Sequence, residues 1–69
     1  MAERLANTLK DERAARGWTQ ADLAERVGVS RKTINTVENG VFVPSTILAL
    51  KLAAALERSV EQLFRVEAL

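Results

Sequence analysis

Residues 18–40, WTQADLAERVGVSRKTINTVENG, contain two short segments of helical periodicity that are separated by a single glycine. A hydroxyl residue, Thr19 or Ser30, stands before each segment and is a favourable N-cap, because its side-chain oxygen accepts a bond from a free amide of the first turn. A glycine, Gly28 or Gly40, follows each segment, as is common at helix C-termini. The stretch therefore predicts two helices joined by a tight turn, over residues 20–27 and 31–39.

The flanking sequence predicts further helices by the same rules. Gly17 follows an N-terminal periodic segment, and Ser45 and Ser59 each stand before another one. Ser59 and Gln62 have the spacing of a capping box. Alternation typical of a strand occurs only in FRVEAL at the C-terminus. We therefore expect one domain over 1–69 with an all-α fold of five helices, at residues 2–16, 20–27, 31–39, 46–56 and 60–64.

The composition limits the classes of function. Sixty-nine residues suffice for one domain whose core is small, because a chain of this size buries only about 60% of its unfolded surface. The chain has no cysteine and no histidine, which excludes disulfides, the usual zinc-ligand sets and a histidine general base. No nucleophile–base pair or glycine-rich phosphate loop is visible, so we expect neither an enzyme nor a cofactor. Without a signal peptide or an apolar run near 18 residues, we expect a cytoplasmic protein that does not span a membrane.

The charge of the chain is nearly balanced, with ten basic and nine acidic residues and a net charge of +1. Non-specific binding to DNA scales with the number of phosphates that a protein neutralises, so this chain is not expected to coat DNA in bulk. Any binding to nucleic acid must rely on local positive charge. Arg26, Arg31 and Lys32 lie near one acidic residue, Glu38, in the middle of the sequence.

The predicted helix 31–39 has two different faces. At 100° per residue, Ile34 and Val37 fall on one side with Thr33 beside them. Every side chain on the opposite side can donate a hydrogen bond, and none is acidic. These side chains are Arg31, Lys32, Asn35, Thr36 and Asn39. Cations in the first turn are disfavoured by the helix dipole, so the stability of the helix does not explain why Arg31 and Lys32 stand there. A polyanion lying against the helix explains it, and two helices at this spacing form a helix-turn-helix whose second helix fits a major groove.

The stretch TQADLAERVGVSRKTINTVENG resembles the repressor/Cro-type helix-turn-helix family, also called the xenobiotic-response-element type. The following PSTILALKLAAALERSVEQLF resembles the fourth and fifth helices of that family, so that the resemblance runs from about Leu9 to Phe64. It implies a sequence-specific regulator of transcription, most simply a repressor, that binds double-stranded DNA. It further implies a homodimer on a pseudo-palindromic operator, with helix 31–39 in the major groove and no cofactor.

The resemblance also assigns roles to individual residues. Matching positions in the family imply base reading by Arg31, Lys32 and Thr36, with Asn35 on the same exposed face. They imply contacts to the DNA backbone by Gln20, Ser30, Thr33 and Asn39, and Gln20 also braces the recognition helix. The loop VFVP at 41–44 departs from the family because it lacks a basic residue. We expect Phe42 of this loop to pack against the body of the domain.

One ion pair is predicted from the faces of the helices. In a helix over 2–16, Arg13 shares an apolar face with Ala2, Leu5, Ala6 and Leu9. A buried charge without a partner is costly, and Glu38 at the inward edge of helix 31–39 is the available partner. We expect a structural Arg13–Glu38 pair, which the family often has as well. Glu12, where relatives often have an apolar residue, is expected to pair with Arg16.

The C-terminal half suggests a partner. From Ile47 to Leu56 only Lys51 is polar, and a helix that is apolar on all sides is central to a core or shared with another chain. In one interpretation Leu63 and Phe64 close the core and the tail frays. In the favoured one, helix 46–56 and the tail form a two-fold contact, with candidate residues Lys51, Ala55, Leu63, Phe64, Val66 and Leu69. An alternative function is an antitoxin-like or adaptor module that binds a partner protein through the same surface.

Overall fold

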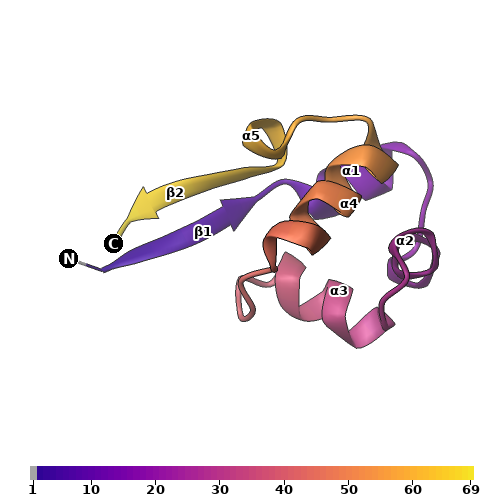
Figure 1. The fold of residues 1–69 in the computed structure, drawn as a ribbon, viewed down its shortest axis with the longest axis horizontal. Coiled ribbons are helices and arrows are strands. Elements are labelled where there is room, and N and C mark those ends of the chain that lie inside the picture. The colour runs from indigo at the N-terminus through magenta and orange to yellow at the C-terminus, as the bar shows by residue number, and fades with distance from the viewer. Residues whose placement is uncertain (1) are drawn as a thin grey trace.

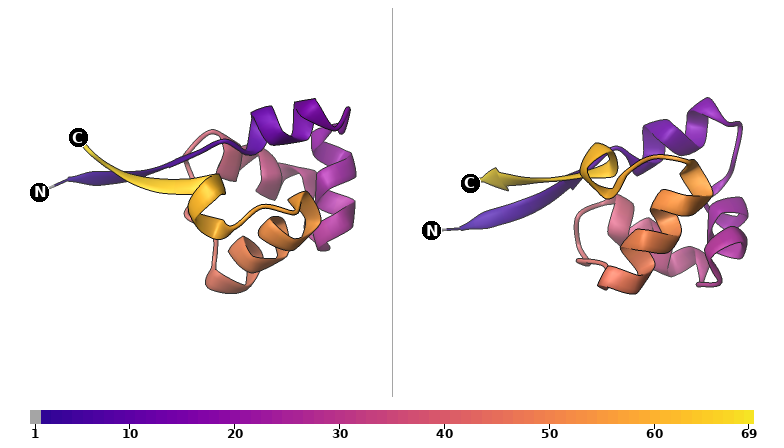
Figure 2. Two further views of the ribbon diagram at one scale, coloured as in Figure 1. Left: turned by 90° about the horizontal axis from the view of Figure 1, so that it is seen from above. Right: turned by 45° about the horizontal axis from the view of Figure 1, so that its top comes forward.

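The computed structural model describes residues 2–69, which form five helices and two strands. In chain order the elements are β1 (Glu3–Asn7), α1 (Leu9–Ala15), α2 (Gln20–Val27), α3 (Arg31–Glu38), α4 (Thr46–Leu56), α5 (Val60–Leu63) and β2 (Phe64–Ala68). The helices gather into one bundle, and the two strands run out from it side by side (Figures 1 and 2). Ala2 and Leu69 therefore lie together at the tip of a β-ribbon.

The ribbon corrects the prediction of an all-α fold with a helix over 2–16. Residues 3–7 form β1, which pairs antiparallel with β2 so that Leu5 lies opposite Val66, and α1 begins only at Leu9. The first strand pairs with the last residues of the chain, and no local propensity reveals such a distant partner. The alternation in FRVEAL is confirmed as β2, and α5 ends one residue earlier than expected.

The predicted caps that define the helix-turn-helix are confirmed. The Thr19 hydroxyl accepts a bond from the Asp22 amide at 3.0 Å, and the Asp22 carboxylate accepts one from the Thr19 amide at 2.9 Å. The Ser30 hydroxyl accepts a bond from the Thr33 amide at 3.1 Å. Gly28 ends α2 in the left-handed region, with φ 74°, where a residue with a Cβ would be strained. These contacts satisfy free amides at the start of both helices and fix the turn between them.

The core is apolar and receives side chains from every helix and from β2. Its buried members are Leu9, Leu23, Ala24, Val27, Ile34, Val37, Leu48, Leu52, Leu56, Leu63 and Phe64. Trp18 and Val29, which precede the caps of α2 and α3, are half-buried and pack against this cluster. Trp18 also lies under the Arg26 guanidinium, whose carbon is 3.9 Å from the ring centroid.

The outer surface of the C-terminal half differs in part from the prediction. Leu63 and Phe64 are buried in the core, which is the first of the two interpretations of the tail, so they present almost no surface to a second copy. Lys51, Val66 and Leu69 are exposed and Ala55 is half-buried. These four residues remain predicted contacts. Among residues 2–69, no helix combines the length and the apolar character that a membrane span requires.

Candidate nucleic-acid interface

Helix α3 turns one side to the core and the other to solvent. Ile34 and Val37 are buried, whereas Arg31, Lys32, Asn35 and Asn39 are exposed. Thr33 and Thr36 lie between these faces and are half-buried. The structure thus places three of the predicted base-reading residues along one outward stripe of α3, namely Arg31, Lys32 and Asn35, and it places Thr36 at the edge of this stripe.

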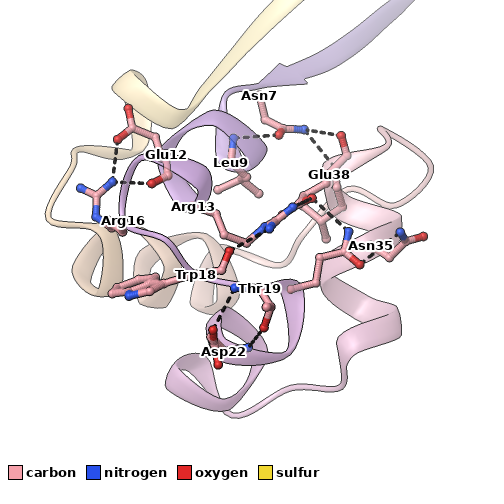
Figure 3. A network of polar contacts seen from close by, with 12 residues as sticks. Asn7, Leu9, Glu12, Arg13, Arg16, Trp18, Thr19, Asp22, Asn35 and Glu38 are labelled. Atoms are coloured by element: carbon pink, nitrogen blue, oxygen red, sulfur yellow. Dashed lines mark hydrogen bonds and ion pairs between the residues drawn. The ribbon is translucent and has the colours of Figure 1, made fainter.

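The orientation of α3 is held by an ion pair in the interior. Arg13 donates to the two carboxylate oxygens of Glu38, from Nε at 2.8 Å and from Nη2 at 3.1 Å, and its Nη1 donates to the carbonyl of Trp18 at 2.9 Å. The Glu38 side chain is only 3% exposed. This is the structural pair predicted from the sequence, and it joins α1 to the last turn of α3 (Figure 3).

The protonation of Glu38 reflects two opposing effects. Burial raises the pKa of Glu38, but the hydrogen bonds from Arg13 and Gln20, together with the charges of Arg13 and Lys10, outweigh burial and leave this pKa below its ordinary value. The bond to Glu38 likewise raises the pKa of Arg13. Both groups are therefore charged at neutral pH, and the pair persists.

A chain of polar side chains continues from this pair to the surface. Gln20 Nε2 donates to Glu38 at 3.1 Å, and Gln20 Oε1 accepts a bond from Asn35 Nδ2 at 3.4 Å. Asn35 Oδ1 in turn accepts a bond from Asn39 Nδ2 at 3.2 Å. Gln20 thus connects the start of α2 with the outward stripe of α3, which is the bracing role expected of it. The rotamer of Asn35 is set by a network that begins in the core.

Positive charge gathers where the first turns of α2 and α3 meet. Gln20, Arg31, Lys32 and Asn35 line a shallow groove there. Neither Arg31 nor Lys32 forms a salt bridge with any of residues 2–69. The start of α2 adds backbone amides, and a helix N-terminus favours anions. The groove therefore has the charge and the donors that suit a phosphate backbone beside a base edge.

The hydroxyl groups of α3 and its N-cap already form hydrogen bonds within the helix. Ser30 Oγ caps α3 and lies 2.9 Å from Thr33 Oγ1. Thr36 Oγ1 donates to the carbonyl of Thr33 at 2.9 Å, so its proton is engaged. Thr36 can offer a ligand its methyl group and its oxygen lone pair, which suits a thymine methyl or a base amino group.

The loop after α3 differs from expectation. The amides of Val41 and Phe42 both donate to the carbonyl of Thr36, at 2.9 and 3.2 Å, and close the end of α3. The Phe42 side chain is 48% exposed, and Val41 and Val43 are more exposed still. The prediction that Phe42 packs against the domain is wrong, because the loop turns its apolar side chains outward.

Asn7 is a structural residue that the sequence did not indicate. Its Nδ2 donates to the carbonyls of Val37 and Glu38, at 3.0 and 3.4 Å, and its Oδ1 accepts from the amide of Leu9 at 3.1 Å. Asn7 thereby joins the base of the ribbon, the start of α1 and the end of α3 (Figure 3). An asparagine just before a helix is a known capping signal, but the expected helix over 2–16 placed Asn7 in its interior.

A second ion pair lies away from α3. Glu12 pairs with Arg16 at 2.9 Å, as predicted, and Arg58 joins them with a bond of 3.2 Å. The bond from Arg16 lowers the pKa of Glu12, burial opposes this effect, and the bond from Arg58 lowers the pKa further. Arg16 also donates to the carbonyl of Leu56 at the end of α4. This cluster attaches α1 to the end of α4 and takes no part in the outward stripe.

Comparison with known proteins agrees with this geometry. A helix-turn-helix family model matches residues 9–63. The chain is 41% identical over 63 residues to the uncharacterized helix-turn-helix-type transcriptional regulator YgzD of Bacillus subtilis, covering 91% of this chain and 96% of YgzD. It is similar to the structure of the biofilm regulator SinR in complex with DNA, with a TM-score of 0.71 and 30% identity over 77% of this chain and 86% of SinR. It is also 38% identical over 55 residues to the antitoxin HipB of Escherichia coli, covering 80% of this chain but only 58% of HipB.

Proposed function

Because this chain belongs to the helix-turn-helix family of DNA-binding transcriptional regulators, we propose that it is a repressor that binds a specific operator. In this proposal a homodimer occupies a pseudo-palindromic site, with α3 of each copy in the major groove. The two half-sites then lie about 34 Å apart, one turn of the DNA helix. Occupation of an operator blocks an overlapping promoter, which is the simplest regulatory result of such binding.

The observation that carries this proposal is the stripe of Arg31, Lys32, Asn35 and Asn39 on an α3 whose opposite side is fixed in the core. Specific readout needs side chains whose positions are set before the DNA arrives. The hydrogen bonds from Glu38 through Gln20 fix the position of the Asn35 side chain in this way. The free guanidinium of Arg31 suits guanine O6 and N7, the commonest specific contact in the major groove.

The remaining residues serve the DNA backbone in this proposal. Gln20 and Ser30 stand at the starts of α2 and α3, where amides and side chains meet a phosphate together. Thr33 and Asn39 extend this contact along α3. Phosphate contacts fix the register of the protein on the duplex and carry no sequence information themselves.

Replacing Arg31 with alanine should weaken binding to the selected operator by about 1–3 kcal/mol and relax the preference at one base pair. The stability of the fold should hardly change, because Arg31 is exposed and forms no salt bridge within residues 2–69. Titration of the operator and of its single-base variants measures both effects. Thr33→Ala is the contrasting variant, because Thr33 is assigned to the DNA backbone and its loss of affinity should be similar for every sequence. An equal loss on all duplexes for Arg31→Ala would remove Arg31 from the base-reading residues.

Selection of bound duplexes from a random pool at two salt concentrations tests the proposal directly. The expected result is an inverted repeat with half-sites one turn apart, whose enrichment persists at the higher salt concentration. Sequence-independent binding that disappears as salt rises would contradict it, since that behaviour belongs to phosphate contacts alone. A reporter gene placed behind the selected site then gives the sign of regulation.

A second candidate function is an antitoxin-like module that also binds a partner protein. The similarity to HipB and the exposed apolar side chains of Ile47 and Leu50 on α4 favour it. Purification of the chain from its native cell tests it. A second protein that leaves the complex after Ile47→Glu, but not after Arg31→Ala, would support this function.

A further inference from the structure

The β1–β2 ribbon lacks the support that small sheets need. Each strand has five residues, and the ribbon extends beyond the helix bundle (Figures 1 and 2). Val66 is 65% exposed and Leu69 at the tip is 78% exposed. A two-stranded ribbon is at best marginally stable in water by itself. The ribbon therefore presents an apolar surface and free edges that a partner would stabilise.

The hydrogen bonds at the two ends of the ribbon set which backbone groups are free. The amide of Leu69 donates to Ala2 at 3.1 Å, and that of Thr8 donates to Leu63 at 3.0 Å. In an antiparallel ladder the residues alternate, so Arg65 and Glu67 turn their backbone groups toward β1. Val66 and Ala68 then turn theirs outward, to the open edge of β2.

The sequence of β2, FRVEA, is complementary to itself in the antiparallel direction. If Val66 faces Val66 of another copy, Arg65 lies opposite the partner's Glu67, and Glu67 opposite the partner's Arg65. The backbone phase allows this register, because Val66 is a residue with outward amide and carbonyl groups. Sliding the partner strand by two residues, the smallest shift that keeps the backbone phase, places Arg65 opposite Arg65 or Glu67 opposite Glu67. Opposite charges across strands stabilise a sheet and like charges destabilise it, so the charges select one register.

We propose that β2 of one copy pairs antiparallel with β2 of a second copy, with Val66 at the two-fold axis, to form the four-stranded sheet β1–β2–β2–β1. This inference rests on the homodimer of the proposed function but not on its binding to DNA. Leu5 and Val66 share one face of the ribbon, and in the dimer they form an apolar row with their counterparts. On the other face Glu67 is already bound to Arg4 and to Arg65 of its own chain, at 2.8 Å each, and in the dimer it also faces the partner's Arg65.

Cysteine substitution tests the register, since the chain has no cysteine of its own. Val66→Cys places two thiols opposite each other, with Cα atoms roughly 5.5 Å apart, a distance that a disulfide spans. Ala68→Cys is the matched control on the same edge, and its two copies lie roughly 14 Å apart along the strands. Mild oxidation should link Val66→Cys into covalent dimers and leave Ala68→Cys unlinked. Equal linking of both variants, or of neither, overturns the proposed register.

Val66→Pro removes the central amide donor from the open edge. Sedimentation of the full chain without DNA should show a dimer dissociation constant raised about tenfold or more, because one bond is lost from each copy. Glu3→Pro, on the open edge of β1, should leave the dimer unchanged. If Val66→Pro remains a dimer and Ile47→Glu becomes a monomer, the inference fails although the homodimer stands. If Val66→Pro is a folded monomer that still binds a single half-site, the pairing of β2 and the DNA interface are shown to be separate.

Discussion

Replacing Arg13 with alanine should lower the free energy of unfolding by about 3–5 kcal/mol. The Glu38 carboxylate would stay in an interior site where its side chain is 3% exposed, with the Gln20 amide as its remaining side-chain donor. An unpaired charge in such a place is costly. A chain of 69 residues typically has only about 3–10 kcal/mol of stability, so this variant should lose a large share of its stability.

Urea denaturation at neutral pH measures this loss, with Arg58→Ala as the matched control. Arg58 also forms one ion pair, with Glu12, but it is exposed, and the cost of its removal should stay below about 1 kcal/mol. The double variant Arg13→Met with Glu38→Leu should recover part of the stability, because no unpaired charge is left inside. A single variant Arg13→Ala within about 1 kcal/mol of the wild type would show that the pair does not hold the fold.

The Arg13–Glu38 pair should make the free energy of unfolding depend on pH in the acid range. The pKa of Glu38 is lowered in the folded protein because bonds from Arg13 and Gln20 outweigh burial. The stabilisation is therefore present above the unfolded value of about 4.5 and is lost as the pH falls through the lower folded pKa. Asp22 and Glu67 also have lowered pKa values, so the measurement is the difference between wild type and Glu38→Gln. The free energy of unfolding of Glu38→Gln should fall less steeply with acid, and parallel curves would contradict the assignment.

The helix-turn-helix was predictable because its determinants are local. Thr19 with Asp22, and Ser30 with the amide of Thr33, act within a single turn, so the sequence alone locates them. The ribbon was not predictable, because β1 becomes a strand only through its pairing with residues 64–68 at the other end of the chain. Leu5 and Ala6 are the only apolar residues of β1, and so short a run fits a helix or a strand equally well by periodicity. Only the tertiary contact distinguishes the two.

The Arg13–Glu38 pair was predicted correctly although the predicted bounds of the first helix were wrong. Ala2, Leu5 and Ala6 do not belong to a helix, but Leu9 and Arg13 are one turn apart on α1 and still share a side. That spacing sufficed to bring Arg13 inward to Glu38. The roles of Asn7 and of the loop at 41–44 could not follow from such spacing, because they depend on where separate elements end in space.

The second large effect is expected for Ile34→Ala in α3. Ile34 is fully buried, and with Val37 it forms the apolar side that holds α3 on the bundle. Its truncation should cost about 2–5 kcal/mol through lost burial and the cavity that remains, whereas Ile34→Val should cost about 0.5–1.5 kcal/mol. Denaturation by urea with a helical circular dichroism signal measures both variants against the wild type. Equal stability of the two variants would mean that the site collapses without a cavity.

The operator affinity of Ile34→Ala shows whether the apolar side of α3 or the polar network from Glu38 orients the DNA-binding stripe. If the apolar side sets the angle of α3, the folded fraction of Ile34→Ala should bind its operator more weakly than Ile34→Val does, although no outward side chain has changed. If the polar network from Glu38 to Asn35 suffices, affinity corrected for the unfolded fraction should be equal for both variants. We expect the first result, because Glu38 holds only the last turn of α3, whereas Arg31 and Lys32 extend from the first turn, on the far side of Ile34.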